Sequence, residues 1–167
     1  MSGPLEGIRV VDLTQVVSGP LATMLLSDQG AEVVKVEPLG VGGDVTRLPS
    51  FAKAGISALF VNNNRGKRSL AIDLTKEEGR KIVVDLVAQA DVFIQNFRPG
   101  AIERLGLSYE DLKELNPKLI YCSISGFGPD GPYSDRPVLD PVIQGLTSMV
   151  SRQLNPQIPF PDLVRNL

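Results

Sequence analysis

Two arginines flank a Pro-Gly corner in the middle of the sequence. The stretch 94–106 reads IQNFRPGAIERLG, and its polar and aromatic candidates are Asn96, Phe97, Arg98 and Arg104. Guanidinium groups donate forked hydrogen bonds that match a phosphate, an aromatic ring can stack, and an amide can hydrogen-bond a base. These residue types predict an anion-binding corner. The alternative is that both arginines are solvated charges at the end of a helix.

Two further stretches carry candidate residues. The run Asn62–Ser69, NNNRGKRS, is basic and polar, which is typical of an exposed loop and also fits a phosphate site. Asp140 precedes Pro141 at the expected start of a helix, where an aspartate either caps the first turn or serves as an auxiliary catalytic carboxylate. The loop after the first expected strand lacks the G-x-G-x-x-G spacing of dinucleotide-binding proteins, which argues against a dehydrogenase.

The composition excludes several kinds of chemistry and partner. Histidine is absent, so serine-histidine triads and histidine-bound zinc are excluded, and no metal site is expected. The 17 Lys and Arg residues against 19 Asp and Glu residues give a net charge of −2. This balance provides no general attraction to nucleic acid or to an anionic membrane. Small molecules and proteins are therefore the expected partners.

Length and cysteine usage indicate a folded protein of the cytoplasm. The 167 residues, 43% of them hydrophobic and 22% charged, should fold around one core. Cys122 has no partner for an intrachain disulfide, which favours a reduced compartment. The sequence has neither a signal-peptide pattern at its start nor an apolar run of about 18 residues. We therefore expect a cytoplasmic protein.

Apolar segments that alternate with helical patterns predict an α/β fold. Expected strands cover residues 8–14, 31–37, 68–74, 91–97 and 118–124, and most are uniformly apolar, as in a parallel sheet covered by helices on both faces. Capping boxes at Thr75–Glu78 and Ser108–Asp111 predict helix starts. The segment Pro38–Gly66 reads as a long irregular excursion with a short helix near Ser57–Val61.

Ligands of open parallel sheets bind beyond the carboxyl ends of the strands, next to helix amino termini. Four stretches are expected at that edge: Gln15–Pro20, the segment from Glu37 onward, Asn96–Arg104 and Gly126–Pro137. The arginine corner is one of them. The topology thus predicts that the anion-binding corner belongs to a ligand site.

Seven blocks of the sequence resemble family III CoA-transferases, the group that includes formyl-CoA transferase, carnitine CoA-transferase and α-methylacyl-CoA racemase. The blocks, in the family's order, are PLEGIRVVDLTQVVSGP, LSDQGAEVVKVE, GDVTR, NRGKRSLAIDL, DVFIQNFRPGAIERLGL, LNPKLIYCSISGFG and DPVIQGLTSM. The resemblance implies the amino-terminal portion of a longer polypeptide whose two copies interlock as a homodimer. Residues 1–150 would form a Rossmann-like CoA-binding domain, and residues 151–167 a linker toward a second domain.

The same resemblance implies which residues hold coenzyme A. They are Val16, Ser18, Ile72, Asn96, Phe97 and Arg104, with Arg98 beside them. No cofactor would be bound permanently, because coenzyme A or acyl-CoA is a substrate together with a carboxylic acid. Formyl-CoA transferases differ at Val17, Pro38, Pro137 and Leu139, where they carry Gln, Arg, Lys and Tyr, which argues against formyl-CoA specificity.

The family's chemistry depends on an aspartate that attacks the acyl-CoA thioester and forms an aspartyl-acyl anhydride. The family spacing places this residue just beyond Leu167, and Asp162 falls too early, so the 167-residue chain alone is expected to be inactive. The racemase branch uses a histidine where this chain has Leu139, which favours a transferase. The alternatives are an acyl-CoA racemase or isomerase, and a non-catalytic α/β fragment that binds a nucleotide.

Overall fold

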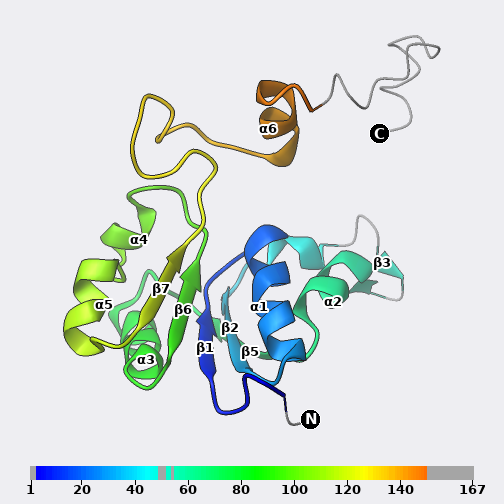
Figure 1. The fold of residues 1–167 in the computed structure, drawn as a ribbon. Coiled ribbons are helices and arrows are strands. Elements are labelled where there is room, and N and C mark those ends of the chain that lie inside the picture. Colours follow the sequence, from blue (N-terminus) through cyan, green and yellow to red (C-terminus); the bar gives the residue numbers. More distant parts are fainter. Residues whose placement is uncertain (1–2, 49–51, 54, 150–167) are drawn as a thin grey trace. The chain divides into compact units, whose positions relative to one another are not determined.

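The computed structural model describes residues 3–48, 52–53 and 55–149 (Figure 1). The chain divides after Ser125 into two compact units. The first contains a five-stranded sheet in the order β5-β2-β1-β6-β7. Its strands are β1 (Arg9–Asp12), β2 (Glu32–Pro38), β5 (Arg68–Ile72), β6 (Val92–Gln95) and β7 (Ile120–Ser123). All neighbouring pairs are parallel, which confirms the predicted sheet.

The direction of chain progression reverses between β1 and β6. From β1 the chain moves outward through β2 to β5, and it then returns to the other side of β1 to form β6 and β7. Val11 therefore pairs with Val34 on one side and with Phe93 on the other. Such a reversal is the switch point at which open α/β sheets bind ligands, beyond the carboxyl ends of the two diverging strands.

Helices cover the two faces of the sheet (Figure 1). They are α1 (Ser18–Asp28) on one face, and α3 (Glu77–Val87), α4 (Ala101–Arg104) and α5 (Tyr109–Leu115) on the other. Successive residues of a strand point to opposite faces, so Val10 packs with α1 and Val11 with α3 to α5. On the face covered by α3 to α5, Phe93 is the largest fully buried apolar side chain.

The long segment between β2 and β5 is more regular than expected. It contains a 3-10 turn, η1 (Val45–Arg47), then a two-stranded antiparallel ladder of β3 (Ala52–Lys53) and β4 (Ile56–Ser57), and then α2 (Ala58–Asn64). The Ser57 hydroxyl caps α2 by accepting a hydrogen bond from the Phe60 amide at 3.3 Å. The predicted short helix is confirmed and extends to Asn64.

One predicted capping box is confirmed and the other is wrong. At the start of α5, the Ser108 hydroxyl and the Asp111 carboxylate exchange hydrogen bonds with each other's backbone amides. At α3, helical residues begin only at Glu77, and Lys76 precedes them without a side-chain cap. The Thr75 hydroxyl instead donates to Asp73 at 2.6 Å, because an aspartate two residues earlier competes for it.

The second unit, described as far as residue 149, contains α6 (Asp140–Leu146). Asp140 is the first helical residue and not the cap, and its carboxylate accepts a hydrogen bond from the Gln144 amide group. The predicted capping role of Asp140 is therefore wrong. The Tyr133 ring makes an edge contact with Phe127, and the Arg136 guanidinium lies over the Tyr133 ring. Across the described ranges of both units, no helix is long and apolar enough to cross a bilayer.

Candidate functional site

The arginine corner follows β6 directly. The chain turns at Gly100, whose φ of 78° is the left-handed conformation that glycine adopts without strain, and α4 then begins. The Arg104 guanidinium lies against this turn, because a Cβ built on Gly100 would be 3.1 Å from its Nη1 atom. Arg98 and Arg104 are both exposed, and within the described ranges neither side chain makes a hydrogen bond or an ion pair. Two free cations therefore face solvent at this edge.

Asn96 connects this corner to the loop after β1. Its Nδ2 atom donates to the Gln15 carbonyl at 2.8 Å, and its Oδ1 atom accepts from the Gln15 amide at 2.9 Å. These bonds close the switch point between β1 and β6. They also engage both polar atoms of the amide that the sequence assigned to a ligand.

The loop between β1 and α1 presents two of the predicted ligand contacts. Val16 and Ser18 are exposed, and Val16 has a φ of 72°, which is uncommon and strained for a β-branched residue. Val17 precedes α1, and no side chain caps this helix amino terminus. The first amide groups of a helix lack partners inside it, so they provide hydrogen-bond donors and partial positive charge at this edge.

A buried ion pair, Asp12–Lys67, holds the start of the loop between β1 and α1. Asp12, fully buried at the end of β1, accepts hydrogen bonds from the Thr14 amide at 2.9 Å and the Thr23 hydroxyl at 2.6 Å. Lys67 Nζ contacts the same carboxylate at 3.0 Å and donates to the Pro20 carbonyl at 2.9 Å. Burial lowers the pKa of the Lys67 ammonium, and the charge of Asp12 opposes that shift.

A second buried ion pair joins β2 to the loop that follows it. Lys35 Nζ donates to the Thr14 carbonyl at 2.7 Å and contacts Asp44 Oδ2 at 3.0 Å, and both side chains are almost completely buried. Asp44 Oδ1 accepts from the Thr46 amide at 2.9 Å and lies 3.4 Å from the Val16 amide. Burial acts to raise the pKa of Asp44, but hydrogen bonds from Thr46 and Lys35 outweigh it and hold the pKa below its usual value.

The Glu37 carboxylate is fully occupied within the fold. Arg47 binds it through Nε at 2.9 Å and Nη2 at 2.8 Å, and the Ser69 hydroxyl donates to it at 3.2 Å. The Arg47 guanidinium also lies 3.6 Å from the centre of the Phe60 ring. Glu37 is therefore not free to bind a ribose. In the part of the chain that the structure describes, no three Cys, Asp or Glu side chains gather as a metal site would require.

A model of the family described as CoA-transferase family III matches residues 5–162. The chain belongs to CoA-transferase family III. The human succinyl-CoA:glutarate CoA-transferase is 44% identical over 148 residues, which is 88% of this chain and 34% of the human protein. An acyl-CoA transferase of Fusarium pseudograminearum is 46% identical over 148 residues, which is 84% of this chain and 32% of that protein.

Solved structures of the family have the same fold. A CaiB/BaiF family protein from Brucella suis superposes with a TM-score of 0.81 at 47% identity, over 87% of this chain and 39% of that one. Rv3272 from Mycobacterium tuberculosis gives 0.84 at 40% identity, over 96% of this chain and 44% of that one. The chain thus spans about a third of the length of the curated relatives and corresponds to their amino-terminal portion.

Most of the residues that the family resemblance implies lie at one edge of the sheet. Val16, Ser18, Asn96 and Phe97 follow β1 and β6, the two strands of the switch point, and the two arginines follow β6. The Phe97 ring is half-buried against the core. Ile72 ends β5 at the same edge, but it lies three strand positions from β6 and its side chain is buried in the core. The structure therefore does not bring Ile72 to the corner.

The buried ion pairs were not predicted, although two charged residues in the sequence point to them. Asp12 and Lys35 interrupt otherwise apolar strands, and a charge in a buried strand requires a partner. The basic run 62–69 resolves into separate roles, because Lys67 pairs with Asp12 inside the fold, while Arg65 and Arg68 make exposed pairs with Asp28 and Glu32. Neither the loop nor the phosphate-site interpretation describes Lys67.

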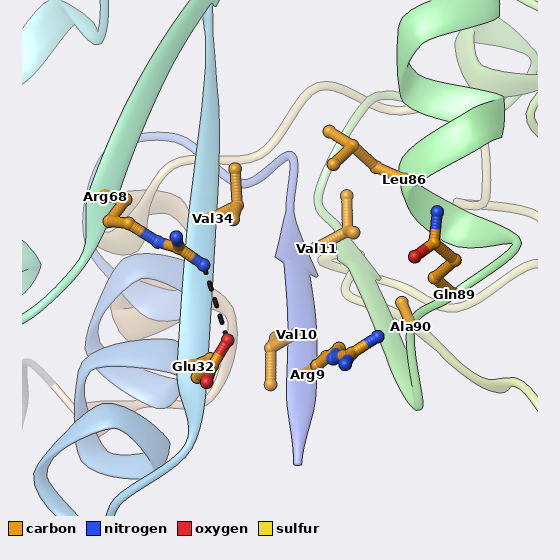
Figure 2. Close-up of a pocket in the computed structure, with 9 residues that line it drawn as sticks. All are labelled: Arg9, Val10, Val11, Glu32, Val34, Arg68, Leu86, Gln89 and Ala90. Atoms are coloured by element: carbon orange, nitrogen blue, oxygen red, sulfur yellow. Dashed lines mark hydrogen bonds and ion pairs between the residues drawn. The ribbon is translucent and has the colours of Figure 1, made fainter. Parts of the chain in front are cut away.

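A groove of about 280 Å³ lies elsewhere on the sheet (Figure 2). Figure 2 shows the end of α3 on one side of it and the exposed Arg68–Glu32 pair on the other, with Val11 and Val34 between them. It contains none of the predicted site residues and lies toward the amino ends of the strands, away from the arginine corner. The arginine corner with the β1–α1 loop is therefore the candidate site of this family III chain.

Proposed function

We propose that this chain provides the coenzyme A site of a CoA-transferase that moves CoA between carboxylic acids. The observation that carries the proposal is the pair of unpartnered guanidinium groups, Arg98 and Arg104, beside the switch point of a parallel sheet. Coenzyme A carries phosphate groups, and arginine binds phosphate through charge-assisted, often bidentate hydrogen bonds. The match to CoA-transferase family III supports the same ligand.

The remaining residues of the corner would orient the bound molecule. The Phe97 ring is available for stacking, while Val16 and Ser18 are exposed where the loop after β1 enters α1. The amino terminus of α1 adds partial positive charge on the same side as the arginines. Asn96 acts through the backbone that it holds, because both of its polar atoms bind Gln15.

The proposed chemistry follows the family's covalent route. An aspartate carboxylate attacks the thioester carbonyl, the carbon–sulfur bond breaks, and an aspartyl-acyl anhydride and the CoA thiolate result. The structure assigns no described residue of this chain to that nucleophile. The role of the described residues is to hold the CoA thiolate in place while the acceptor acid is loaded.

Several properties of the whole protein belong to the same proposal. We infer a homodimeric cytoplasmic enzyme that acts on acyl-CoA and carboxylic acid substrates, with no permanently bound cofactor. The curated relatives act on several different acids by name, including oxalate, glutarate and mesaconate.

Calorimetric titration of the full-length chain with coenzyme A tests the proposed site. Arg104→Ala should weaken binding by about 1.5 to 3 kcal/mol, the usual loss for a hydrogen bond to a charged group. Arg9→Ala is the matched control, since Arg9 is an exposed arginine that lines the groove at the opposite ends of the strands. Equal affinity of the Arg104 variant and the wild type would return Arg104 to the role of a solvated charge.

A further inference from the structure

Three consecutive residues of the β1–α1 loop are held by side chains from other segments. Lys35, on β2, donates to the Thr14 carbonyl at 2.7 Å. Asn96, after β6, binds both backbone groups of Gln15. Asp44, from the loop after β2, lies 3.4 Å from the Val16 amide, at the long limit of a hydrogen bond. The backbone of this exposed loop is thus fixed by long-range contacts.

The conformation that these contacts hold is a costly one. Val16 has a φ of 72°, and a β-branched side chain is strained in this region because its Cβ crowds the backbone. Strain of this kind persists only where the surrounding structure enforces it, and it occurs preferentially at ligand sites. Of the non-glycine residues that the structure describes, Ser148 alone shares this property, and it lies in the other unit.

The Asp44 carboxylate that faces the Val16 amide is itself held in place by other residues. Asp44 is buried, and its Oδ1 atom also accepts from the amide of Thr46 at 2.9 Å and from the hydroxyl of that residue at 2.8 Å, which fixes the carboxylate in the η1 turn. Lys35 is 1% exposed and lies opposite Asp12 in the β1–β2 register, so the sheet fixes its position. The 3.0 Å contact between Lys35 and Asp44 then joins the two supports of the loop.

We propose that Lys35 and Asp44 are positioning residues that hold Val16 in its left-handed conformation and so present the Val16–Ser18 loop to coenzyme A. The inference rests on the proposed function. It assigns these two buried charges a role in ligand recognition that neither performs by direct contact. A loop that is already ordered in its binding conformation loses less entropy when the ligand binds, which favours affinity.

A double-mutant cycle separates positioning from general stability. Asp44→Ala in the full-length protein removes the Oδ1 atom that faces the Val16 amide, so it should weaken coenzyme A binding about tenfold. Glycine adopts positive φ without strain, so Val16→Gly removes the need for an anchor. In the Val16→Gly background, the Asp44→Ala substitution should therefore change the dissociation constant by less than about twofold.

The neighbouring residue supplies the matched control. Val17 has a negative φ of −126°, so glycine there relieves no left-handed strain, and Val17→Gly should leave the effect of Asp44→Ala at about tenfold. A buried lysine without its partner can prevent folding. The second variant is therefore Lys35→Met combined with Asp44→Ala, which removes both charges of this buried pair and should give the same pattern with Val16→Gly.

Crystal structures of the variants supply a reading that does not depend on the ligand. The proposal expects a negative φ at residue 16 when Asp44 is replaced in the Val16 background. A positive φ in that variant would overturn it, as would wild-type affinity of Asp44→Ala or an equal loss in the Val16→Gly background. If the wild-type protein itself binds no coenzyme A, the proposed function fails, and the φ of residue 16 still decides the positioning role.

Discussion

The amide of Asn96 shows how a residue predicted to bind a ligand can also hold the fold together. Its type and its position after a buried strand mark it as a binding residue, yet Nδ2 and Oδ1 each bind the backbone of Gln15. Without these bonds, the backbone groups that close the switch point would lose their partners. Asn96 therefore contributes to the site through the stability and the shape of the β1–α1 loop.

Replacing Asn96 should cost stability as well as affinity. Asn96→Ala leaves the Gln15 amide and carbonyl without their partners, so we expect the free energy of unfolding to fall by about 1 to 3 kcal/mol. Urea unfolding followed by circular dichroism measures it. Asn62→Ala is the control, because Asn62 is exposed on α2 and its replacement should change stability by less than about 0.5 kcal/mol. Equal effects of the two substitutions would refute the role given to Asn96.

Residue type points to the exposed candidates for the site and gives no indication of how the buried ion pairs next to them are formed. Arg98 and Arg104 could be found because free guanidinium groups beside a glycine turn suggest an anion, whatever the rest of the fold does. The partnership of Lys35 with Asp44 depends on how the loop after β2 folds back over the strand end. Nothing in the local sequence specifies that return, so the pair becomes visible only in three dimensions.

At the scale of elements, a small residue sets how closely α1 approaches the loop after β1. Gly19 lies in the first turn of α1, and a Cβ built there would be 2.3 Å from both Cβ and Cγ2 of Thr14. Thr14 is fully buried and its hydroxyl donates to Asp12, so it cannot move aside without breaking that bond. The close packing of α1 against the loop after β1 therefore requires glycine at this position.

A larger residue at this crossing should destabilise the fold. Gly19→Ala should lower the free energy of unfolding by about 1 to 3 kcal/mol, the usual cost of overpacking a closed site. Gly145→Ala is the matched control, because Gly145 also lies in a helix but a Cβ there would meet nothing within 4 Å. The control should be neutral or gain up to about 1 kcal/mol from helix propensity. Thermal unfolding of both variants compares them, and a stable Gly19→Ala protein would contradict the packing argument.

Elements were predictable where local patterns decide them. Uniformly apolar strands correctly indicate a parallel sheet, because such strands are buried on both faces. The order β5-β2-β1-β6-β7 is not local, since it depends on the side of β1 to which the chain returns after α3. Capping shows the same limit within a few residues: Ser108 caps α5 as expected, whereas Asp73 takes the hydroxyl of Thr75.

For the whole molecule, a near-neutral net charge conceals an uneven distribution of charge. The net charge is −2, yet two lysine–aspartate pairs are buried side by side beneath the candidate site. Burying charges is costly, and breaking such a pair leaves an uncompensated ion inside the fold. Protonation of Asp44 should therefore influence the stability of the first unit.

Asp44 gives this pH dependence a definite sign. Its pKa in the folded protein lies below the ordinary value of 3.8, because hydrogen bonds from Thr46 and Lys35 outweigh the effect of burial. Above pH 3.8 the carboxylate is charged in both states and its stabilising contribution is complete. As the pH falls below 3.8, the unfolded chain binds the proton first, so this contribution decreases until the pH has passed the folded pKa.

Urea unfolding between about pH 2.5 and about pH 6 tests this expectation. The wild type should lose stability below pH 3.8, and Asp44→Asn should start from a lower stability and lose less of it, because it has no carboxylate to protonate at this position. Asp85→Asn is the control, since Asp85 makes only an exposed pair with Lys81 on α3. That variant should keep the wild-type slope, because exposed pairs contribute little. Parallel curves for the wild type and Asp44→Asn across the acid range would show that the buried Lys35–Asp44 pair does not govern acid unfolding.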